Sequence, residues 1–188
     1  PVHSAWRALE KFTSGRIGSW NGPRSFQKYE IRRTLDALSG CGADVTSWRD
    51  HAYRYDEHTV ELLGDAGITH FSDQVGPDKQ IRNEGETTVV PVNTPPDHEH
   101  IYHAFRTRRS KAVERFEGPF GGESVPVEAW TDWVVDQIEA IQKSGGTATV
   151  LAHPSCLWLA DEFEAFEELL SAIELRDPRP MHEVVATK

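Results

Sequence analysis

The strongest constraint on the fold is the alternation of helical repeats with short apolar segments of strand-like composition. The clearest repeat gives a helix one apolar face, formed by Val127, Trp130, Val134, Ile138 and Ile141. Gly145 and Gly146 end this helix, and the β-branched run Thr147–Leu151 follows directly. Earlier strands are expected over residues 45–49, 68–71 and 89–92. This alternation predicts an α/β fold in which helices cover a mostly parallel sheet.

Length and periodicity predict one domain of ordinary size. A chain of 188 residues is long enough to bury a sizeable core. Further helices are expected over residues 5–12, 25–40, 57–66 and 161–173. Residues 93–126 show no convincing periodicity outside 102–105. A loop this long inside a compact domain is usually functional.

Composition excludes several classes of partner. The formal net charge is −10, which argues against nucleic acid and anionic membranes. The apolar runs are too short to span a bilayer, and no signal peptide is visible. Cys41 and Cys156 form no disulfide framework, so we expect a cytoplasmic protein. The chain begins at Pro1 rather than methionine, so processing or truncation is open, as is the oligomeric state.

Polar residues follow three of the expected strands. Arg49 ends the first strand, Asp73 follows the second, and His153 follows Thr147–Leu151. The carboxyl ends of parallel strands meet at one edge of a sheet, where α/β folds assemble their active sites. We therefore expect Arg49, Asp73 and His153 to converge on one concave surface, with Asp73 or a close acid in reach of the His153 ring. A core histidine with a structural hydrogen bond is the alternative for His153.

In this order, these residues resemble the motifs of NodB-type polysaccharide deacetylases. Leu151-Ala152-His153 resembles the family's Leu-x-His motif, and Arg49 and Asp73 resemble its arginine and aspartate motifs. The resemblance implies an incomplete (β/α) barrel of roughly five to seven mostly parallel strands. It also implies a metal-dependent hydrolase that cleaves an N-acetyl or related amide C–N bond with metal-activated water. In such an enzyme His153 is the general acid, Asp73 tunes it, and Arg49 steers the catalytic base.

The chain also departs from that family. The aspartate pair that follows the first strand of the family has no counterpart, so residues 1–188 resemble the C-terminal two-thirds of such a domain. His3 resembles what remains of the family's two-histidine metal motif. The chain is then a fragment, a divergent subgroup, or a catalytically inactive carbohydrate-binding or structural module. Residues upstream of Pro1 would discriminate between an enzyme and an inactive module.

A histidine-rich segment over residues 97–103 is the second candidate for metal binding. His98 and His100 could ligate a divalent cation, with zinc as the first candidate, together with His3. On an extended segment the His-x-His spacing places both rings on the same side. A solvated polar loop is the alternative interpretation. Without further ligands we expect metal binding to be weak.

Residues near the expected strand ends are candidates for substrate binding. His51 and Tyr53 follow Arg49, and Trp158 lies in the segment after His153. An aromatic ring at the rim of a pocket stacks on sugars. The resemblance therefore implies a carbohydrate or a small amide as substrate, bound beside these three residues.

Overall fold

The computed structural model describes residues 21–56, 58–101, 118–121 and 124–185. The chain divides into two compact units. Unit 1 comprises Pro1–Asp73, Ile81–Val90 and Met181–Lys188, and unit 2 comprises Gln74–Gln80 and Pro91–Pro180. The single domain expected over residues 1–188 stays a prediction. His3 and the helix expected over residues 5–12 lie outside the described residues.

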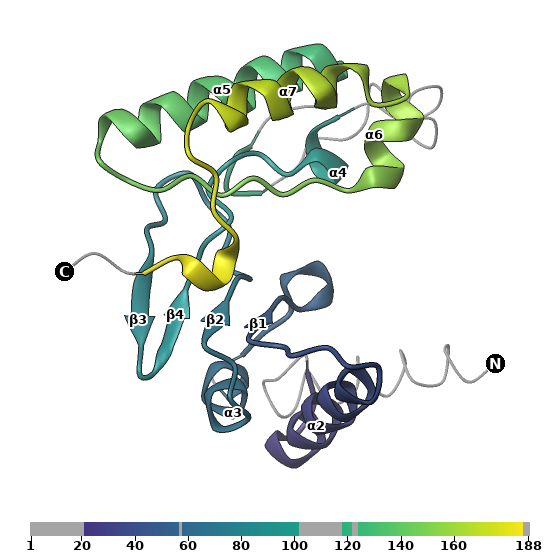
Figure 1. The fold of residues 1–188 in the computed structure, drawn as a ribbon, viewed down its shortest axis with the longest axis vertical. Helices are drawn as coiled ribbons and strands as arrows, with labels where there is room; N and C mark the ends of the chain where they lie inside the picture. The colour runs from purple at the N-terminus through teal and green to yellow at the C-terminus, as the bar shows by residue number, and fades with distance from the viewer. Residues whose placement is uncertain (1–20, 57, 102–117, 122–123, 186–188) are drawn as a thin grey trace. The chain divides into compact units, whose positions relative to one another are not determined.

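Unit 1 contains a small mixed sheet of four strands. The strands are β1 (Ser47–Trp48), β2 (His70–Phe71), β3 (Arg82–Glu84) and β4 (Thr87–Val89), in the order β1-β2-β4-β3 (Figure 1). β1 and β4 both pair with β2 in parallel, whereas β3 pairs with β4 in an antiparallel hairpin. Gly85, with φ of 62°, turns that hairpin. The α/β class is confirmed, while the incomplete barrel stays a prediction because the described strands form only this sheet.

Helices of unit 1 pack their apolar residues against the sheet. They are α2 (Arg24–Gly40) and α3 (Thr59–Asp65), with the single turns η1 (His51–Tyr53) and η2 (Met181–Glu183). Their shared core consists of Ile31, Leu62, Leu63, Ile68, Phe71 and Val89. The segment after η2 is tied to the sheet because the ring of buried His70 lies 2.9 Å from the carbonyl oxygen of Val184.

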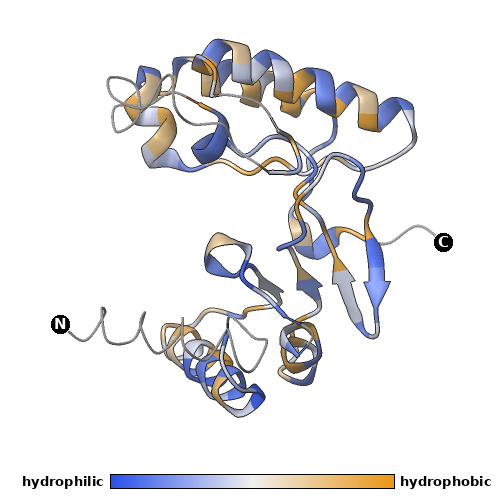
Figure 2. Ribbon diagram, turned by 180° about the vertical axis from the view of Figure 1, so that it is seen from behind, coloured by the Kyte–Doolittle hydropathy of each residue, from blue (hydrophilic) through white to orange (hydrophobic). Residues whose placement is uncertain are grey.

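Unit 2 is built around two long helices that pack side by side. These are α5 (Val127–Lys143) and α7 (Glu164–Glu174), and the unit also contains α4 (Asp97–His100) and α6 (Pro154–Asp161) (Figure 1). Hydrophilic and hydrophobic residues alternate along α5 and α7, as amphipathic helices require (Figure 2). Their buried faces contribute to a core of Ile101, Val127, Trp130, Val134, Ile138, Leu157, Ala165 and Leu169. In the described part of the chain, no helix combines the length and hydropathy needed to cross a membrane.

The strand expected over Thr147–Leu151 is wrong. These residues belong to no strand, although Ala148 and Val150 pack against the core of unit 2 with the alternation of a strand. Their backbone is bonded instead by side chains: Asn93 donates to the carbonyl oxygen of Thr147 at 2.9 Å and accepts from the amide of Thr149 at 2.8 Å. Thr94 donates to the carbonyl oxygen of Thr149 at 2.8 Å. Side chains therefore replace the neighbouring strand that the sequence predicted.

Candidate acid–base and metal site

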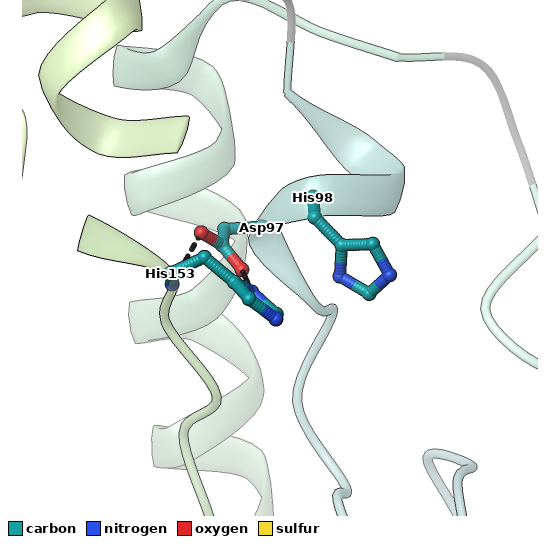
Figure 3. Close-up of side chains that lie close together, drawn as sticks. All are labelled: Asp97, His98 and His153. Carbon is teal, nitrogen blue, oxygen red and sulfur yellow. Dashed lines mark hydrogen bonds and ion pairs between the residues drawn. The ribbon is translucent and has the colours of Figure 1, made fainter. Parts of the chain in front are cut away.

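Two short helices of unit 2 place Asp97, His98 and His153 beside one another. Asp97 is the first residue of α4, after the extended residue Pro96, and His98 follows it. His153 precedes Pro154, which begins α6 because its fixed φ suits the first turn of a helix. The sequence predicts a helix over residues 161–173, which corresponds to α7, whereas α6 is not predicted. Figure 3 shows the three side chains, with the Asp97 carboxylate directed at His153.

Asp97 binds His153 through both of its carboxylate oxygens. Oδ1 lies 2.6 Å from Nδ1 of the ring, and Oδ2 accepts a hydrogen bond of 2.6 Å from the backbone N–H of His153. The Asp97 side chain is fully buried, whereas 41% of the His153 side chain is exposed. A carboxylate only accepts hydrogen bonds, so Nδ1 carries the proton and Nε2 remains for another partner. Asp97 thus sets both the orientation and the tautomer of the His153 ring.

His98 completes a group that could hold a metal ion. Its ring centroid lies 4.5 Å from that of His153, with an interplanar angle of 61°. One ligand atom each from Asp97, His98 and His153 lies within 4.8 Å of the others. Imidazole and carboxylate are ligands that several divalent cations accept, so this donor set does not identify the metal.

The two histidines of the predicted metal cluster point to different surroundings. Because α4 is helical, residues two apart do not share a face, and the extended His-x-His arrangement is wrong. His98 joins His153, whereas the buried His100 ring lies 5.1 Å from the ring of Trp133 and 6.1 Å from that of Phe120. His100 is not among the three residues of the candidate metal group.

Arg49 and Asp73 lie together in unit 1, where the parallel strands β1 and β2 end. Nε of Arg49 donates to the carbonyl oxygen of Ser72 at 2.8 Å, and the backbone N–H of Asp50 donates to both oxygens of Asp73 at 2.9 Å each. Of the two expected possibilities, Asp73 or a close acid, the carboxylate bound to the ring of His153 is a different acid, Asp97. Convergence of Arg49 and Asp73 with His153 stays a prediction.

Burial changes the acidity of the two carboxyl groups in unit 1. Desolvation raises the pKa of Asp73 to about 8, and the Asp50 backbone N–H opposes this effect. The charge of Asp50 raises the Asp73 pKa further, whereas Arg49 lowers it. Desolvation also raises the pKa of Asp50, against the hydrogen bond from Trp48. Asp73 is therefore suited to hold a proton at neutral pH.

The predicted substrate-binding residues lie in both units. His51 and Tyr53 form η1 in unit 1, with His51 exposed and Tyr53 half-buried. Trp158 lies on α6 in unit 2 with 51% of its surface exposed, and its ring centroid is 5.5 Å from that of Phe163. Trp158 is exposed on the helix that begins after His153, where a ligand could reach its ring. Its role in substrate binding stays a prediction.

Asp97 belongs to the candidate site, but the sequence indicated it only as a member of the histidine-rich segment. The rule that polar residues gather at strand ends does not find it, because β4 ends at Val89 in unit 1 and residues 147–151 form no strand. The available signal was its position next to His98, in the segment already considered for metal binding.

Comparisons with known proteins leave the family of this chain open. No family model matches it, and neither a curated protein nor a solved structure matches it significantly.

Proposed function

We propose that this protein is a hydrolase that cleaves the C–N bond of an N-acetyl group or a related amide. The observation that supports the proposal is the contact between Asp97 and His153. Enzymes use this arrangement for proton transfer: a buried carboxylate binds one ring nitrogen of a partly exposed imidazole. The resemblance to NodB-type polysaccharide deacetylases is the reason for choosing an amide, in a carbohydrate or small molecule, as the substrate.

In the proposed reaction, His153 protonates the leaving amine. Nε2 is the nitrogen available for this transfer because Asp97 holds Nδ1. Because the proton on Nδ1 is held by Asp97, Nε2 first accepts a proton from the attacking water; it then passes this proton to the amide nitrogen as the C–N bond breaks, and the water oxygen stays on the acyl carbon. While the ring is positive, the Asp97 carboxylate stabilises the charge without moving. Asp97 acts through His153 and is therefore a positioning residue, whereas His153 is the catalytic residue.

The proposal includes a divalent cation, with zinc as the first candidate. Asp97, His98 and His153 are the described residues that would hold it, and their donor atoms are close enough to do so. When bound, zinc would polarise an acyl oxygen and activate water. A cation on Nε2 of His153 would exclude that nitrogen from proton transfer. A carboxylate on Nδ1 orients Nε2 equally for a proton or for a metal ion, so the reason for choosing His153 as the proton donor is the resemblance, in which it is the general acid.

The test of the reaction is acetate release from N-acetylated chitooligosaccharides and from 4-nitroacetanilide. We expect His153→Ala to lower kcat by about 10²–10⁴-fold, the usual contribution of a general acid. Asp97→Asn should lower kcat by at least about tenfold while the fold is retained, because the amide favours the wrong tautomer. The exposed His182 provides a matched control, since His182→Ala should leave the rate unchanged. An unaffected rate in His153→Ala would remove that residue from the mechanism.

The role of the metal is tested by zinc titration calorimetry on the chain, on His98→Ala and on His153→Ala. If His153 is the proton donor, His98→Ala should weaken zinc binding and lower kcat, and added zinc at high concentration should inhibit by occupying Nε2. If zinc binds tightly and only the zinc-loaded protein is active, while His153→Ala removes both properties, His153 is a ligand instead. An intact protein with no turnover on either substrate would favour the inactive carbohydrate-binding module.

A further inference from the structure

An apolar stripe runs from α6 onto α7 in unit 2 and is formed by Trp158, Phe163, Phe166 and Leu170. The ring centroid of Trp158 lies 5.5 Å from that of Phe163, which lies 6.3 Å from that of Phe166. Leu170 continues the stripe, because it follows Phe166 by one turn on the same side of α7. A contiguous apolar surface of this kind is typical of a protein interaction site.

The stripe is exposed at its ends and anchored in its middle. Trp158 is 51% exposed and Leu170 is 47% exposed, although both side chains are large and apolar. Phe163 and Phe166 are half-buried and pack against the core of unit 2. A surface that is already held by the core loses little side-chain freedom when a partner covers it.

Carboxylates border the apolar stripe. An open depression of about 520 Å³ is lined by acidic residues that are neighbours of the two phenylalanines in sequence, namely Asp161, Glu162, Glu164 and Glu167. Residues 161–174 include no Lys or Arg. The next cation along the chain, Arg176, forms its ion pair with Glu139 on α5. The surface beside the stripe is therefore strongly negative.

This combination suits a cationic helix better than the other possible occupants. From Phe163 to Leu170 the stripe extends about 10 Å along α7, which matches roughly two turns of a partner helix. Helices that dock in this way place apolar side chains one turn apart. A second copy of the chain, with its net charge of −10, would bring like charges together. A neutral sugar stacks on Trp158 but gains nothing from the carboxylates or from Leu170.

We propose that the apolar stripe is a docking site for a cationic amphipathic helix of a partner protein. Apolar side chains of that helix would cover the stripe, and its Lys or Arg residues would face the carboxylates of the depression. The buried aromatic contacts supply most of the affinity, whereas the charges set orientation and speed of association. The inference does not depend on the proposed hydrolase activity.

The test measures binding of a fluorescein-labelled peptide of Leu and Lys, about four helical turns long, to the full chain by fluorescence anisotropy. We expect saturable binding of one peptide per chain that weakens as salt is added. A peptide of the same composition, with its Leu residues spread around the helix, should bind at least about tenfold more weakly. Trp158→Ser combined with Leu170→Ser should lower the affinity at least about tenfold. Tyr29→Ser, at a 58% exposed aromatic on α2, is the matched control and should leave it unchanged.

A charge variant decides the matter even if the apolar variant does not fold. Glu164 and Glu167 are both exposed, so Glu164→Gln/Glu167→Gln should retain the fold, which circular dichroism would check. This variant should bind the peptide at least about fivefold more weakly at low salt, with a smaller salt dependence. Asp36→Asn/Asp44→Asn changes the net charge by the same amount at exposed sites in unit 1, and it should have little effect.

Three results would overturn the proposal. Equal binding of the two peptides, or equal losses in the two charge variants, would show attraction to the net charge rather than docking on the stripe. Self-association in sedimentation that Trp158→Ser abolishes would assign the stripe to a second copy of the chain. A neutral chitooligosaccharide that shifts the Trp158 indole N–H resonance, when the peptide does not, would assign the stripe to a carbohydrate.

Discussion

At the scale of single residues, the surroundings of a carboxylate decide what it can do. Asp97 and Asp73 are both buried aspartates after a strand-like segment. Asp97 accepts two separate hydrogen bonds from His153, one of them from the ring, and so orients a base. Asp73 shares one backbone N–H between its oxygens, and burial raises its pKa. The first arrangement suits a residue that positions a histidine, and the second suits a carboxyl group that keeps its proton.

The raised pKa of Asp73 predicts how stability depends on pH. An unfolded aspartate ionises near pH 3.9, whereas Asp73 in the folded chain keeps its proton up to about 8. The folded state therefore binds more protons between these values, so the free energy of unfolding should fall as pH rises through this window and level off above it. We expect a total loss on the order of a few kcal/mol from this group.

Urea unfolding at several pH values would measure this loss. In Asp73→Asn the decline between about pH 5 and 8 should be much shallower than in the unmodified chain, because the titrating group is gone. The exposed Asp36→Asn change serves as the control and should keep the original slope. If the unmodified chain becomes more stable as pH rises through this window, the assigned environment of Asp73 is wrong.

At the scale of elements, side chains form the hydrogen bonds that short backbone segments do not receive from a neighbouring strand. Asn93 is 2% exposed and uses its amide group for the backbone of Thr147 and Thr149, as a neighbouring strand would. Arg49 does the same for Ser72 beyond the end of β2. Each of these side chains satisfies backbone groups that would otherwise lose hydrogen bonds on burial.

Removing the Asn93 amide should therefore destabilise the segment that leads to His153. Asn93→Ala leaves a carbonyl oxygen and an amide without their partner, and we expect a loss of about 2–4 kcal/mol from two such groups. Hydrogen exchange at the amide of Thr149 should accelerate more than exchange within α5. Asn83, which is exposed on β3, gives the matched control, and Asn83→Ala should cost less than about 0.5 kcal/mol.

The position of α5 depends on a buried tryptophan. Trp130 is fully buried, and its Nε1 donates to the carbonyl oxygen of Pro95 at 2.9 Å. Trp130→Phe keeps most of the apolar volume but removes the donor, so we expect a loss of about 1–3 kcal/mol in chemical denaturation. Trp158→Phe, at an exposed site on α6, should change the stability by less than about 0.5 kcal/mol. Equal effects of the two changes would contradict the role given to Trp130.

At the scale of the whole molecule, the chain passes repeatedly between the two units. Unit 1 contains three separate stretches and unit 2 contains two, so each unit needs segments that are distant in sequence. Separate cores nevertheless exist, with Leu63 at the centre of one and Leu169 in the other, both fully buried. The interleaved connectivity favours cooperative unfolding, as expected for a single domain.

Core truncations in the two units test this cooperativity. Leu63→Ala and Leu169→Ala should each cost about 2–5 kcal/mol, because each leaves a cavity in a packed core. In calorimetry both variants should lower the same single transition, with the exposed Leu175→Ala as a control that leaves it unchanged. Two transitions, each sensitive to only one of the variants, would show that the units fold independently and that the prediction of one domain is wrong.

The sequence by itself determined several of the local elements and the polarity of the site. The apolar repeat of α5, the stripe of α7 and the apolar segments of β1 and β2 depend on neighbouring residues, and the structure confirms them. His153 was identified because a titratable residue followed a strand-like run, and that reasoning depends only on local order.

Only the tertiary structure decided which groups meet. Asp97 and His153 are 56 residues apart, and α4 turns Asp97 and His98 toward His153 while it places His100 against Trp133. Thr147–Leu151 has the composition of a strand but pairs with side chains of Asn93 and Thr94. Composition sets the secondary structure that a segment prefers. Its hydrogen-bond partners depend on the backbone or side chains that packing brings alongside it. Such partners are long-range, so local patterns cannot specify them.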